Sequence, residues 1–451
     1  MKNESVSVLK RRNSKLSVIG LGKLGLCTAA CFAEAGYSVV GVDNNPDVIQ
    51  QIQRGKAPYK ETGLQELLIK VSTDMEVKQS DYQYCIEKTD TTFLIVPTPS
   101  TSKGNFSNQY LIDSLTPLAK FLSKNPKPYH LFVVISTVTP GSLMEELIPL
   151  VEFHSNRQFN KGFGMCYNPE FIALGSVIQD FFSPDMVLIG EGKRTDGNFL
   201  EEIYRSTCKN QPYFARMSIP SAEITKISLN AFVTMKISFV NTLTELCDGI
   251  PEADIDSITS ALGADKRIGK NFLQGGAPFG GPCFPRDNLA FSVFAQNNGS
   301  RALLAEATDQ INQSHSKFII RRLEMLVKNT PSTVGIIGCA YKPFTSVIEE
   351  SFSIQLIREL QHKNYSITIF DPAAVSNVRQ IFKDSLEYAD SLEQCVNNCA
   401  VIVITLPDKN YSVIGKYLKK TSGKIIFDLW RVLKDQDLSG HQYLGLGRRN
   451  D

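Results

Sequence analysis

The chain has 451 residues, of which 42% are hydrophobic and 21% are charged, as in ordinary globular proteins. This length is too great for a single hydrophobic core and predicts about three domains. The formal net charge of +2 excludes the strong field that nucleic-acid or membrane-surface binding requires, so the expected partner is a small molecule. No run reaches the roughly 18 uninterrupted apolar residues that a membrane helix needs.

Ten cysteines and five histidines are spread along the chain. The cysteines form no C-x-x-C pair and have no histidines at zinc-ligand spacing, which argues against a metal site and against a disulfide framework. This cysteine usage is typical of a reducing compartment, so we predict a cytoplasmic protein without a metal. The basic cluster at residues 10–12 imitates the start of a secretory signal. Because Lys23 interrupts the apolar stretch that follows, we interpret the cluster as a tail before a buried strand.

A nucleotide-binding pattern opens the predicted fold. An apolar strand over residues 16–19 leads into the motif Gly20-Leu-Gly22-Lys23-Leu24-Gly25, then a helical stretch over 26–35 and a second strand over 37–42 that ends in Asp43. The glycines allow a tight turn and let a pyrophosphate approach the helix N-terminus, and the acid accepts a hydrogen bond from the adenosine ribose. The pattern therefore predicts dinucleotide binding, with NAD favoured over NADP because Asp43 would repel a 2′-phosphate.

Further strands of the same sheet are predicted over residues 91–96, 131–135, 164–167 and 186–189. Ligands of open α/β sheets lie beyond the carboxyl ends of the strands. Thr98, Ser136 and Thr137 follow two of these strands, so we expect them to line the cofactor cleft. Taken singly, each is more often a turn or cap residue.

Two long helical stretches come next. Apolar residues recur at intervals of three and four over residues 219–247, which predicts a helix. Lys226 and Asn230 are four residues apart and share one face of it, although a solvated pair would have the same spacing. A second helix is predicted over residues 301–327. Helical middles of this kind often carry a subunit contact, so we expect a homodimer.

The α/β pattern restarts at residue 333. A predicted strand leads to a degenerate glycine turn at Gly338 that carries Lys342, whose ammonium suits a phosphate of a different nucleotide. More strands are predicted over residues 366–370, 401–405 and 424–427. The predicted fold class is α/β, with two Rossmann-like doubly wound parallel-sheet domains joined by a central all-helical domain. The expected domains are residues 1–215, 216–328 and 329–451.

A cysteine lies in the least regular stretch of the chain. Four glycines and three prolines over residues 275–287 forbid both helix and regular strand, which predicts a loop of specified path. Cys283 lies in it, with Arg286 nearby to favour the thiolate, and is a candidate nucleophile. The alternative interpretation is a small buried hydrophobic residue in a tight turn.

Taken together and in order, these motifs resemble the UDP-glucose/GDP-mannose dehydrogenase family of nucleotide-sugar 6-dehydrogenases. The resemblance runs from about residue 16 to residue 448. It rests on Gly20-Leu-Gly-Lys-Leu-Gly25, Val96-Pro-Thr-Pro99, Ser136-Thr-Val138, Asn168-Pro-Glu-Phe171, Lys226 with Asn230, Arg267-Ile-Gly269, Phe279-Gly-Gly-Pro-Cys-Phe-Pro-Arg-Asp287 and Ala340-Tyr-Lys-Pro343. Within the family, the form of the loop around Cys283 is most similar to that of the UDP-glucose branch.

The resemblance implies that a C6 alcohol of a nucleotide sugar is oxidised twice, to the carboxylate, with NAD as the oxidant. Cys283 would attack the intermediate aldehyde and carry a thiohemiacetal and then a thioester. The favoured substrate is UDP-glucose and the product UDP-glucuronate. Another sugar nucleotide, GDP-mannose or a UDP-N-acetylhexosamine, is the alternative within the family.

The resemblance also implies roles for the other catalytic residues. Lys226 would stabilise the developing oxyanion, with Asn230 donating beside it. Glu170 is the implied acid/base for thioester hydrolysis, Asp287 would hold the water or the lysine, and Thr137 would complete the water network.

Cofactor and substrate residues follow from the same motifs. The expected cofactor residues are Gly20, Gly22, Lys23, Leu24, Gly25, Asp43, Thr98, Ser136 and Arg286. The implied substrate residues are Phe171, Arg267, Phe279, Gly280, Lys342 and Arg431. By the resemblance, Arg267 would reach a neighbouring subunit's substrate. Lys342 and the backbone of Phe279 and Gly280 would hold the nucleotide diphosphate.

Some positions depart from the family pattern. Leu174 replaces a usual glutamate, Met186 a common arginine, and an acid stands near Glu349 where a cofactor-facing arginine is expected. These departures motivate an alternative from another class, a non-catalytic protein that binds NAD and a sugar nucleotide. A β-hydroxyacid dehydrogenase is the other enzyme alternative, but that family ends after its helical domain and has no cysteine loop. None of the five histidines lies in a motif, which disfavours a histidine-based dehydrogenase.

Overall fold

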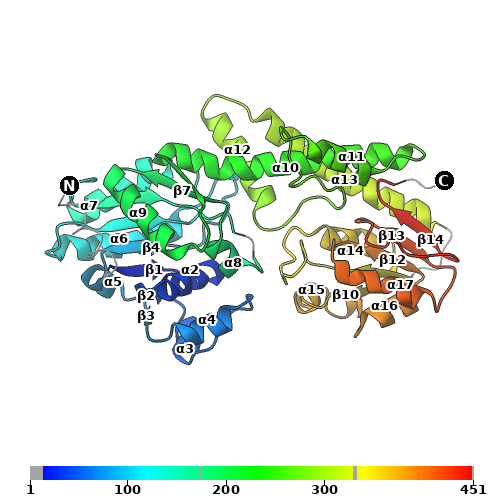
Figure 1. The fold of residues 1–451 in the computed structure, drawn as a ribbon, viewed down its shortest axis with the longest axis horizontal. Coiled ribbons are helices and arrows are strands. Elements are labelled where there is room, and N and C mark those ends of the chain that lie inside the picture. Colours follow the sequence, from blue (N-terminus) through cyan, green and yellow to red (C-terminus); the bar gives the residue numbers. More distant parts are fainter. Residues whose placement is uncertain (1–13, 173, 329–332, 449–451) are drawn as a thin grey trace. The chain divides into compact units, whose positions relative to one another are not determined.

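The computed structural model describes residues 14–172, 174–328 and 333–448 (Figure 1). The basic cluster at residues 10–12 and the predicted start of the third domain at residue 329 lie outside the described residues. The chain divides into two compact units, residues 1–227 and 228–451, and each has its own hydrophobic core. The predicted three-domain bounds stay a prediction.

The first unit is built on an eight-stranded sheet in the order β3-β2-β1-β4-β5-β6-β7-β8. All neighbouring strands are parallel except β6 and β7. The order reverses where β1 pairs with both β2 and β4, and sheets of this kind bind ligands at such a switch point. The strands are β1 Lys15–Ile19, β2 Ser38–Asp43, β3 Met75–Gln79, β4 Thr91–Leu94, β5 Leu131–Val134, β6 Gly164–Tyr167, β7 Met186–Glu191 and β8 Tyr213–Ser218.

Helices cover both faces of this sheet (Figure 1). Alternate residues of the central strands face opposite ways, so Val18 packs into one core and Ile19 into the other. Phe32 of α2 anchors the first core, with its ring centroid 4.8 Å from that of Phe93. The helices are α2 Lys23–Glu34, α3 Pro46–Gln53, α4 Leu64–Lys70, α5 Tyr82–Lys88, α6 Gln109–Lys124, η1 Leu143–Leu147, α7 Ile148–Ser155, α8 Val177–Phe182 and α9 Arg194–Thr207.

The second unit contains an all-parallel six-stranded sheet in the order β11-β10-β9-β12-β13-β14. Its central strands are fully buried apolar runs, as parallel sheets covered on both faces require. The strands are β9 Thr333–Ile337, β10 Ser366–Phe370, β11 Glu387–Tyr388, β12 Val401–Ile404, β13 Ile425–Asp428 and β14 Gln442–Gly445. The helices are α14 Phe352–His362, α15 Val375–Phe382, η2 Lys383–Ser385, α16 Leu392–Asn398, η3 Lys409–Val413 and α17 Ile414–Leu418.

A helical region lies between the two sheets in the sequence. It comprises α10 Ile219–Gly249, α11 Ile255–Ala264, α12 Phe284–Asn297 and α13 Leu303–Val327. The division between the compact units falls within α10. α12 is fixed to α13 by Asn288, whose side-chain amide donates to Ala305 O (2.9 Å) and to Asp309 (2.7 Å). In the part of the chain that the structure describes, every helix is too short or too polar to cross a bilayer.

The predicted fold class is confirmed, with one local correction. The prediction of a loop over residues 275–287 is wrong at its C-terminal end, because α12 begins at Phe284 and Cys283 is its N-cap residue. Pro285 lies in the first turn, where the missing N–H would have had no helical partner, so a proline there starts a helix and does not break one.

Candidate active site

Two glycines of the first turn, Gly20 and Gly25, have no room for a side chain. A Cβ on Gly20, whose φ is +90°, would lie 2.3 Å from Ile95 O, and one on Gly25 would lie 1.8 Å from Gly20 O. A Cβ on Gly22 would meet nothing within 4 Å, so space is open beside the N-terminus of α2, which begins at Lys23. A pyrophosphate fits this position by charge and by access to the backbone amides.

Asp43 lies at the end of β2 beside the same turn. Its Oδ2 accepts a hydrogen bond from Leu21 N (2.7 Å) and its Oδ1 from Asn45 N (2.8 Å). The carboxylate is thereby fixed at the switch point, half-buried, where an adenosine ribose can donate to it. The turn and this acid together fit the dinucleotide that the sequence predicts.

The hydroxyl residues at the ends of β4 and β5 join two loops. Ser136 Oγ donates to Val96 O (2.6 Å) and accepts from Val96 N (3.0 Å), while Thr98 Oγ1 donates to Thr137 O (2.6 Å). Thr98 and Ser136 are buried. The structure therefore brings Thr98, Ser136 and Thr137 together as predicted for their positions, and their contact with a cofactor stays a prediction.

Lys226 lies beside Glu170, which follows β6. Lys226 Nζ donates to the main-chain oxygen of Glu170 (2.6 Å) and lies 4.5 Å from the ring centroid of Phe171. Tyr204 OH donates to Glu170 Oε1 (2.8 Å). Burial raises the pKa of the Glu170 carboxyl to about 7, and the Tyr204 hydroxyl and the Lys226 charge partly oppose that rise. A carboxyl with this pKa suits a general acid/base near neutral pH.

Tyr204 is a residue that the sequence did not reveal. It lies on α9, 34 residues after its carboxylate partner, and its ring is buried in the first core. No local pattern distinguishes it from an ordinary core tyrosine.

Cys283 is exposed at the N-terminus of α12. The other nine cysteines are buried or half-buried. The partial positive charge of a helix N-terminus favours a thiolate, so the helix adds to the effect expected from Arg286. Burial and the adjacent Cys283 charge raise the pKa of Tyr341 to about 12.

Asp287 and Asn230 meet one helical turn beyond the cysteine. Asp287 N donates to Cys283 O (2.8 Å), and Asn230 Nδ2 donates to Asp287 Oδ2 (2.6 Å). Arg286 Nε lies 3.8 Å from Asp287 Oδ1. Asp287 and Asn230 are both buried. The second unit thus brings four of the predicted residues together around the start of α12.

Arg431 anchors the start of the glycine-rich segment at Gly275. Its guanidinium is 2% exposed, and all five of its N–H groups point at protein acceptors. Nη2 donates to Gly275 O (2.8 Å), Nη1 to Leu446 O (2.7 Å) and to Leu429 O (3.2 Å), and both Nε and Nη2 to Asp256. The structure therefore uses Arg431 as an anchor of the cysteine loop, and the predicted nucleotide contact stays a prediction.

The remaining predicted substrate residues occupy different settings. The Phe279 ring packs edge-on against that of Phe284, and a Cβ on Gly280 would lie 1.9 Å from Glu350 O. Lys342 lines a pocket of about 180 Å³ at the carboxyl ends of β9, β10 and β12. Arg267 is paired with Asp265 (2.6 Å), and its side chain is 88% exposed. The predicted contact of Arg267 with a neighbouring subunit's substrate stays a prediction.

The departures from the family pattern are accommodated locally. Leu174 and Met186 pack against the two cores of the first unit. The main-chain oxygen of Glu349 accepts a hydrogen bond from Gly281 N (3.1 Å), so this segment supports the cysteine loop through its backbone.

Comparison with known proteins matches these pieces to one family. Three models of the UDP-glucose/GDP-mannose dehydrogenase family match the chain: the NAD binding domain at residues 14–208, the central domain at 220–314 and the UDP binding domain at 335–435. The chain is 31% identical to UDP-glucose 6-dehydrogenase AglM of Haloferax volcanii, covering 93% of this chain and 97% of that protein. It is 30% identical to UDP-glucose 6-dehydrogenase YwqF of Bacillus subtilis, covering 96% and 98%.

A solved structure agrees. A UDP-glucose dehydrogenase from the archaeon Pyrobaculum islandicum superposes with a TM-score of 0.88 at 28% identity, covering 97% of this chain and 98% of that one. The matches span nearly the whole chain and include the NAD binding domain that the glycine turn predicts. The chain therefore belongs to the UDP-glucose/GDP-mannose dehydrogenase family and is an NAD-dependent nucleotide-sugar dehydrogenase.

Proposed function

We propose that the protein oxidises UDP-glucose to UDP-glucuronate, a four-electron reaction. The observation that carries the proposal is Cys283, exposed at the N-terminus of α12 with Asp287 and Asn230 one turn away. The substrate is supported by the similar proteins, which are named UDP-glucose 6-dehydrogenases. When bound at the first glycine turn, NAD supplies the acceptor for each hydride.

The first oxidation converts the C6 alcohol to an aldehyde, with loss of a hydride and a proton. An aldehyde hydrogen leaves as hydride only after a nucleophile has made the carbon tetrahedral. We assign that step to the Cys283 thiolate, whose sulfur bonds to C6 and gives a thiohemiacetal. Loss of the second hydride then leaves a thioester. Lys226 and Asn230, one turn apart on α10, are assigned to the oxyanion.

Hydrolysis releases the product. Water adds to the thioester carbon, the carbon–sulfur bond breaks, and the carboxylate and the thiolate are restored. We assign removal of the water proton to Glu170, because its pKa of about 7 matches a base that works near neutral pH. Over the whole reaction one alcohol and one water yield a carboxylate, two reduced cofactors and three protons.

We also propose that the protein is a cytoplasmic homodimer. α10 carries three large apolar side chains at seven-residue spacing that are more than half exposed: Phe232 (61%), Phe239 (54%) and Leu246 (57%). Apolar stripes of this size on a helix mark an interface with another helix. Phe239→Glu should therefore halve the mass measured by light scattering, and an unchanged mass would count against this surface.

The experiment that tests the function is a panel of UDP- and GDP-sugars with NAD, in which NADH and uronate are both counted. We expect two NADH and one UDP-glucuronate for each UDP-glucose consumed. Preference for another sugar would move the substrate assignment within the family. One NADH with free aldehyde would contradict the covalent route, and binding of both ligands without NADH would favour a non-catalytic protein.

A further inference from the structure

A buried histidine contacts the segment that leads to Cys283. His315 lies on α13 and is fully buried, with its ring stacked on that of Phe318 (centroids 6.0 Å apart). Its Nε2 lies 2.8 Å from Gly276 O and its Nδ1 lies 2.8 Å from Glu245 Oε1. We call residues 275–283 the cysteine loop. His315 thus connects the cysteine loop to α10.

The two partners of His315 restrict where its protons are. A main-chain oxygen can only accept a hydrogen bond, and so can an ionised carboxylate. A neutral imidazole has a single N–H and could donate to only one of them. Both hydrogen bonds form when His315 is an imidazolium beside the Glu245 carboxylate, or when a neutral His315 accepts from a protonated Glu245. In either form Nε2 donates to Gly276 O.

Other side chains fix the neighbouring positions of the cysteine loop. Gly276 N donates to Asn241 Oδ1 (3.1 Å). Asn312 accepts from Phe279 N and donates to Phe279 O, both at 2.9 Å. A glycine-rich loop has little stiffness of its own, so these contacts from α10 and α13 set its path. His315, held in turn by Glu245, is one of these contacts.

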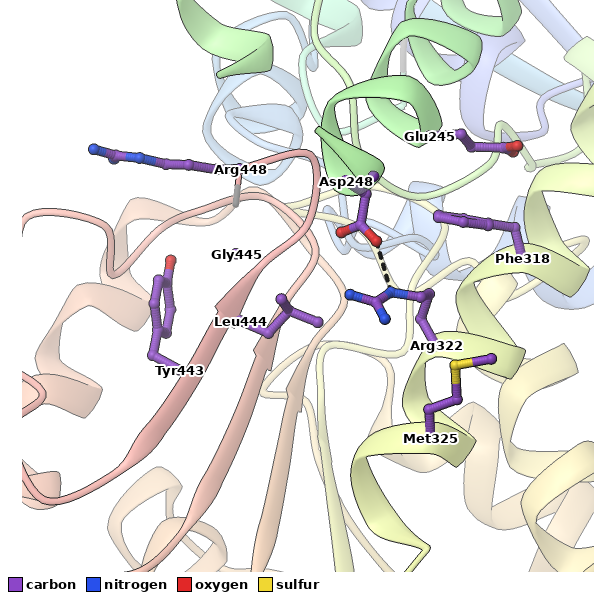
Figure 2. Close-up of a pocket in the computed structure, with 10 residues that line it drawn as sticks. Glu245, Asp248, Phe318, Arg322, Met325, Tyr443, Leu444, Gly445 and Arg448 are labelled. Atoms are coloured by element: carbon purple, nitrogen blue, oxygen red, sulfur yellow. Dashed lines mark ion pairs between the residues drawn. The ribbon is translucent and has the colours of Figure 1, made fainter. Parts of the chain in front are cut away.

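The pair also reaches a pocket. Glu245 lines a cavity of about 440 Å³ formed by the end of α10, by α13 and by β14 (Figure 2). Arg322 and Asp248 form an ion pair of 2.6 Å in its wall, and Phe318, the ring that stacks on His315, also lines it. The side chain of Glu245 is 31% exposed whereas that of His315 is 0% exposed. Glu245 therefore lies between the buried imidazole and the pocket.

We propose that His315, supported by Glu245, is a positioning residue that holds the cysteine loop and so sets the place of Cys283. The hydrogen bond to Gly276 O fixes the loop seven residues before the nucleophile, and the contact with Glu245 holds the other ring nitrogen. A sulfur displaced by about 1 Å loses much of its reactivity toward a bound carbon. The catalytic consequence rests on the proposed function, whereas the ordering of the loop does not.

The test compares His315→Leu, His315→Gln and Glu245→Gln in the full chain. The first removes the donor, the second keeps an amide N–H that can reach Gly276 O, and the third offers an N–H to Nδ1 of a neutral imidazole. Hydrogen–deuterium exchange of the cysteine-loop amides reports order, and kcat and KM with NAD and UDP-glucose report catalysis. Thermal unfolding of each variant separates these effects from global stability.

We expect His315→Leu to speed exchange of the loop amides and to lower kcat by about tenfold to hundredfold, because the sulfur is displaced, with KM for NAD within about twofold of the parent. His315→Gln should fall between Leu and parent, and Glu245→Gln should retain loop order. His130→Leu is the matched control, because His130 is also fully buried and bonded, to Thr92 (2.8 Å), but belongs to the first unit. It should lower stability and leave loop exchange unchanged.

Loop exchange and kcat within about twofold of the parent in both His315 variants would overturn the proposal. If His315→Leu does not fold, His315→Gln decides by the same two readouts. Should no sugar nucleotide yield NADH with the parent, the proposed function fails while the exchange measurement still tests the positioning role.

Discussion

The two sheets begin with the same turn and use it in opposite ways. Gly20 follows β1 with φ +90° and donates to Val42 O (2.8 Å), while Gly338 follows β9 with φ +94° and donates to Phe370 O (2.9 Å). Each turn faces an aspartate at the end of the neighbouring strand, Asp43 in the first unit and Asp371 in the second. The backbone scaffold of a nucleotide site is therefore present twice.

The aspartates differ in what they bind. Asp371 accepts four main-chain hydrogen bonds, two of them from the turn itself at Cys339 N (2.6 Å) and Ala340 N (3.1 Å). The other two come from Ala373 N and Ala374 N, both at 2.8 Å. Asp43 accepts one amide of its turn. In the second turn, the Asp371 carboxylate thus binds two of the turn's own amides. In the first turn, Asp43 binds only one, so other amides can be offered to a ligand.

The helix that follows each turn differs as well. α2 begins at Lys23, directly after the first turn, so its N-terminus faces the site. α14 begins only at Phe352, and Ser353 donates back to Gly338 O (2.8 Å). The intervening loop carries Lys342. The same backbone scaffold can therefore offer a phosphate either a helix N-terminus or the point charge of a lysine on a loop.

A side chain placed in the first turn should have the largest effect of the changes considered, because it closes the predicted NAD site. Gly25→Val would place its Cβ 1.8 Å from Gly20 O, and we expect NAD affinity to fall by about a hundredfold or more. In the second turn, Gly338→Ala would place its Cβ 2.7 Å from the Leu406 side chain and strain a positive φ. It should lower the free energy of unfolding by about 1–3 kcal/mol and leave NAD affinity unchanged. Calorimetric titration with NAD and thermal unfolding distinguish the two, and equal effects on NAD would refute the difference in use.

Exchanging each aspartate for asparagine should have smaller effects, on stability in the second turn and on NAD binding in the first. Asp371→Asn replaces an acceptor by an amide donor that faces backbone N–H groups, and each unsatisfied amide costs about 1–3 kcal/mol of stability. Asp43→Asn should chiefly raise KM for NAD, by about tenfold, and weaken discrimination against NADP. Steady-state kinetics and urea unfolding of both variants check this. A larger stability loss for Asp43→Asn than for Asp371→Asn would contradict the assignment.

The smallest predicted effect concerns two carboxyl groups, Glu170 and Asp428. Burial raises the pKa of Glu170 and of Asp428, and a tyrosine hydroxyl contacts each. Asp428 also accepts from the main chain at Trp430 and Leu433, as a structural group would. Tyr204→Phe removes a hydrogen bond that favours the Glu170 carboxylate, so its pKa should rise further.

Activity should rise with pH because only the ionised Glu170 carboxylate can act as the base. Activity limited by Glu170 should increase as pH rises through about 7, and Tyr204→Phe should move that midpoint to higher pH. Tyr443→Phe, beside Asp428, is the control and should leave the midpoint in place. Because the folded pKa of Glu170 exceeds its ordinary value of 4.5, its contribution to stability is lost as pH rises from about 4.5 to 7. An unshifted activity profile in Tyr204→Phe would remove Glu170 as the titrating base.

The strands that the sequence did not predict share one physical property. They are β3, β8, β11 and β14, and they are the four edges of the two sheets. Central parallel strands are buried on both faces and read as apolar runs, such as the one at Val401–Ile404. An edge strand is partly exposed and mixes polar with apolar residues, as Tyr213–Ser218 does. Hydrophobic runs therefore predicted the central strands of each sheet and missed the edge strands.

The site shows the same division between local and distant information. The glycine turn, Asp43, and Asn230 and Asp287 as single candidates were predictable because motifs carry them. The hydrogen bond between Asn230 and Asp287, across 57 residues, was not predicted. The roles of Arg431 and His315 were not, because their partners at Gly275 and Gly276 lie 156 and 39 residues away. The start of α12 was missed because proline counts as a helix breaker unless it lies in the first turn.

The central claim is that the Cys283 sulfur carries the sugar carbon between the two oxidations. Cys283→Ala tests it most directly, in an assay that measures UDP-glucuronate by mass spectrometry and UDP-glucose binding by calorimetry. The claim predicts that uronate formation falls by about a thousandfold or more while the dissociation constant for UDP-glucose stays within about twofold of the parent. Uronate formed at the parental rate by this variant would contradict it.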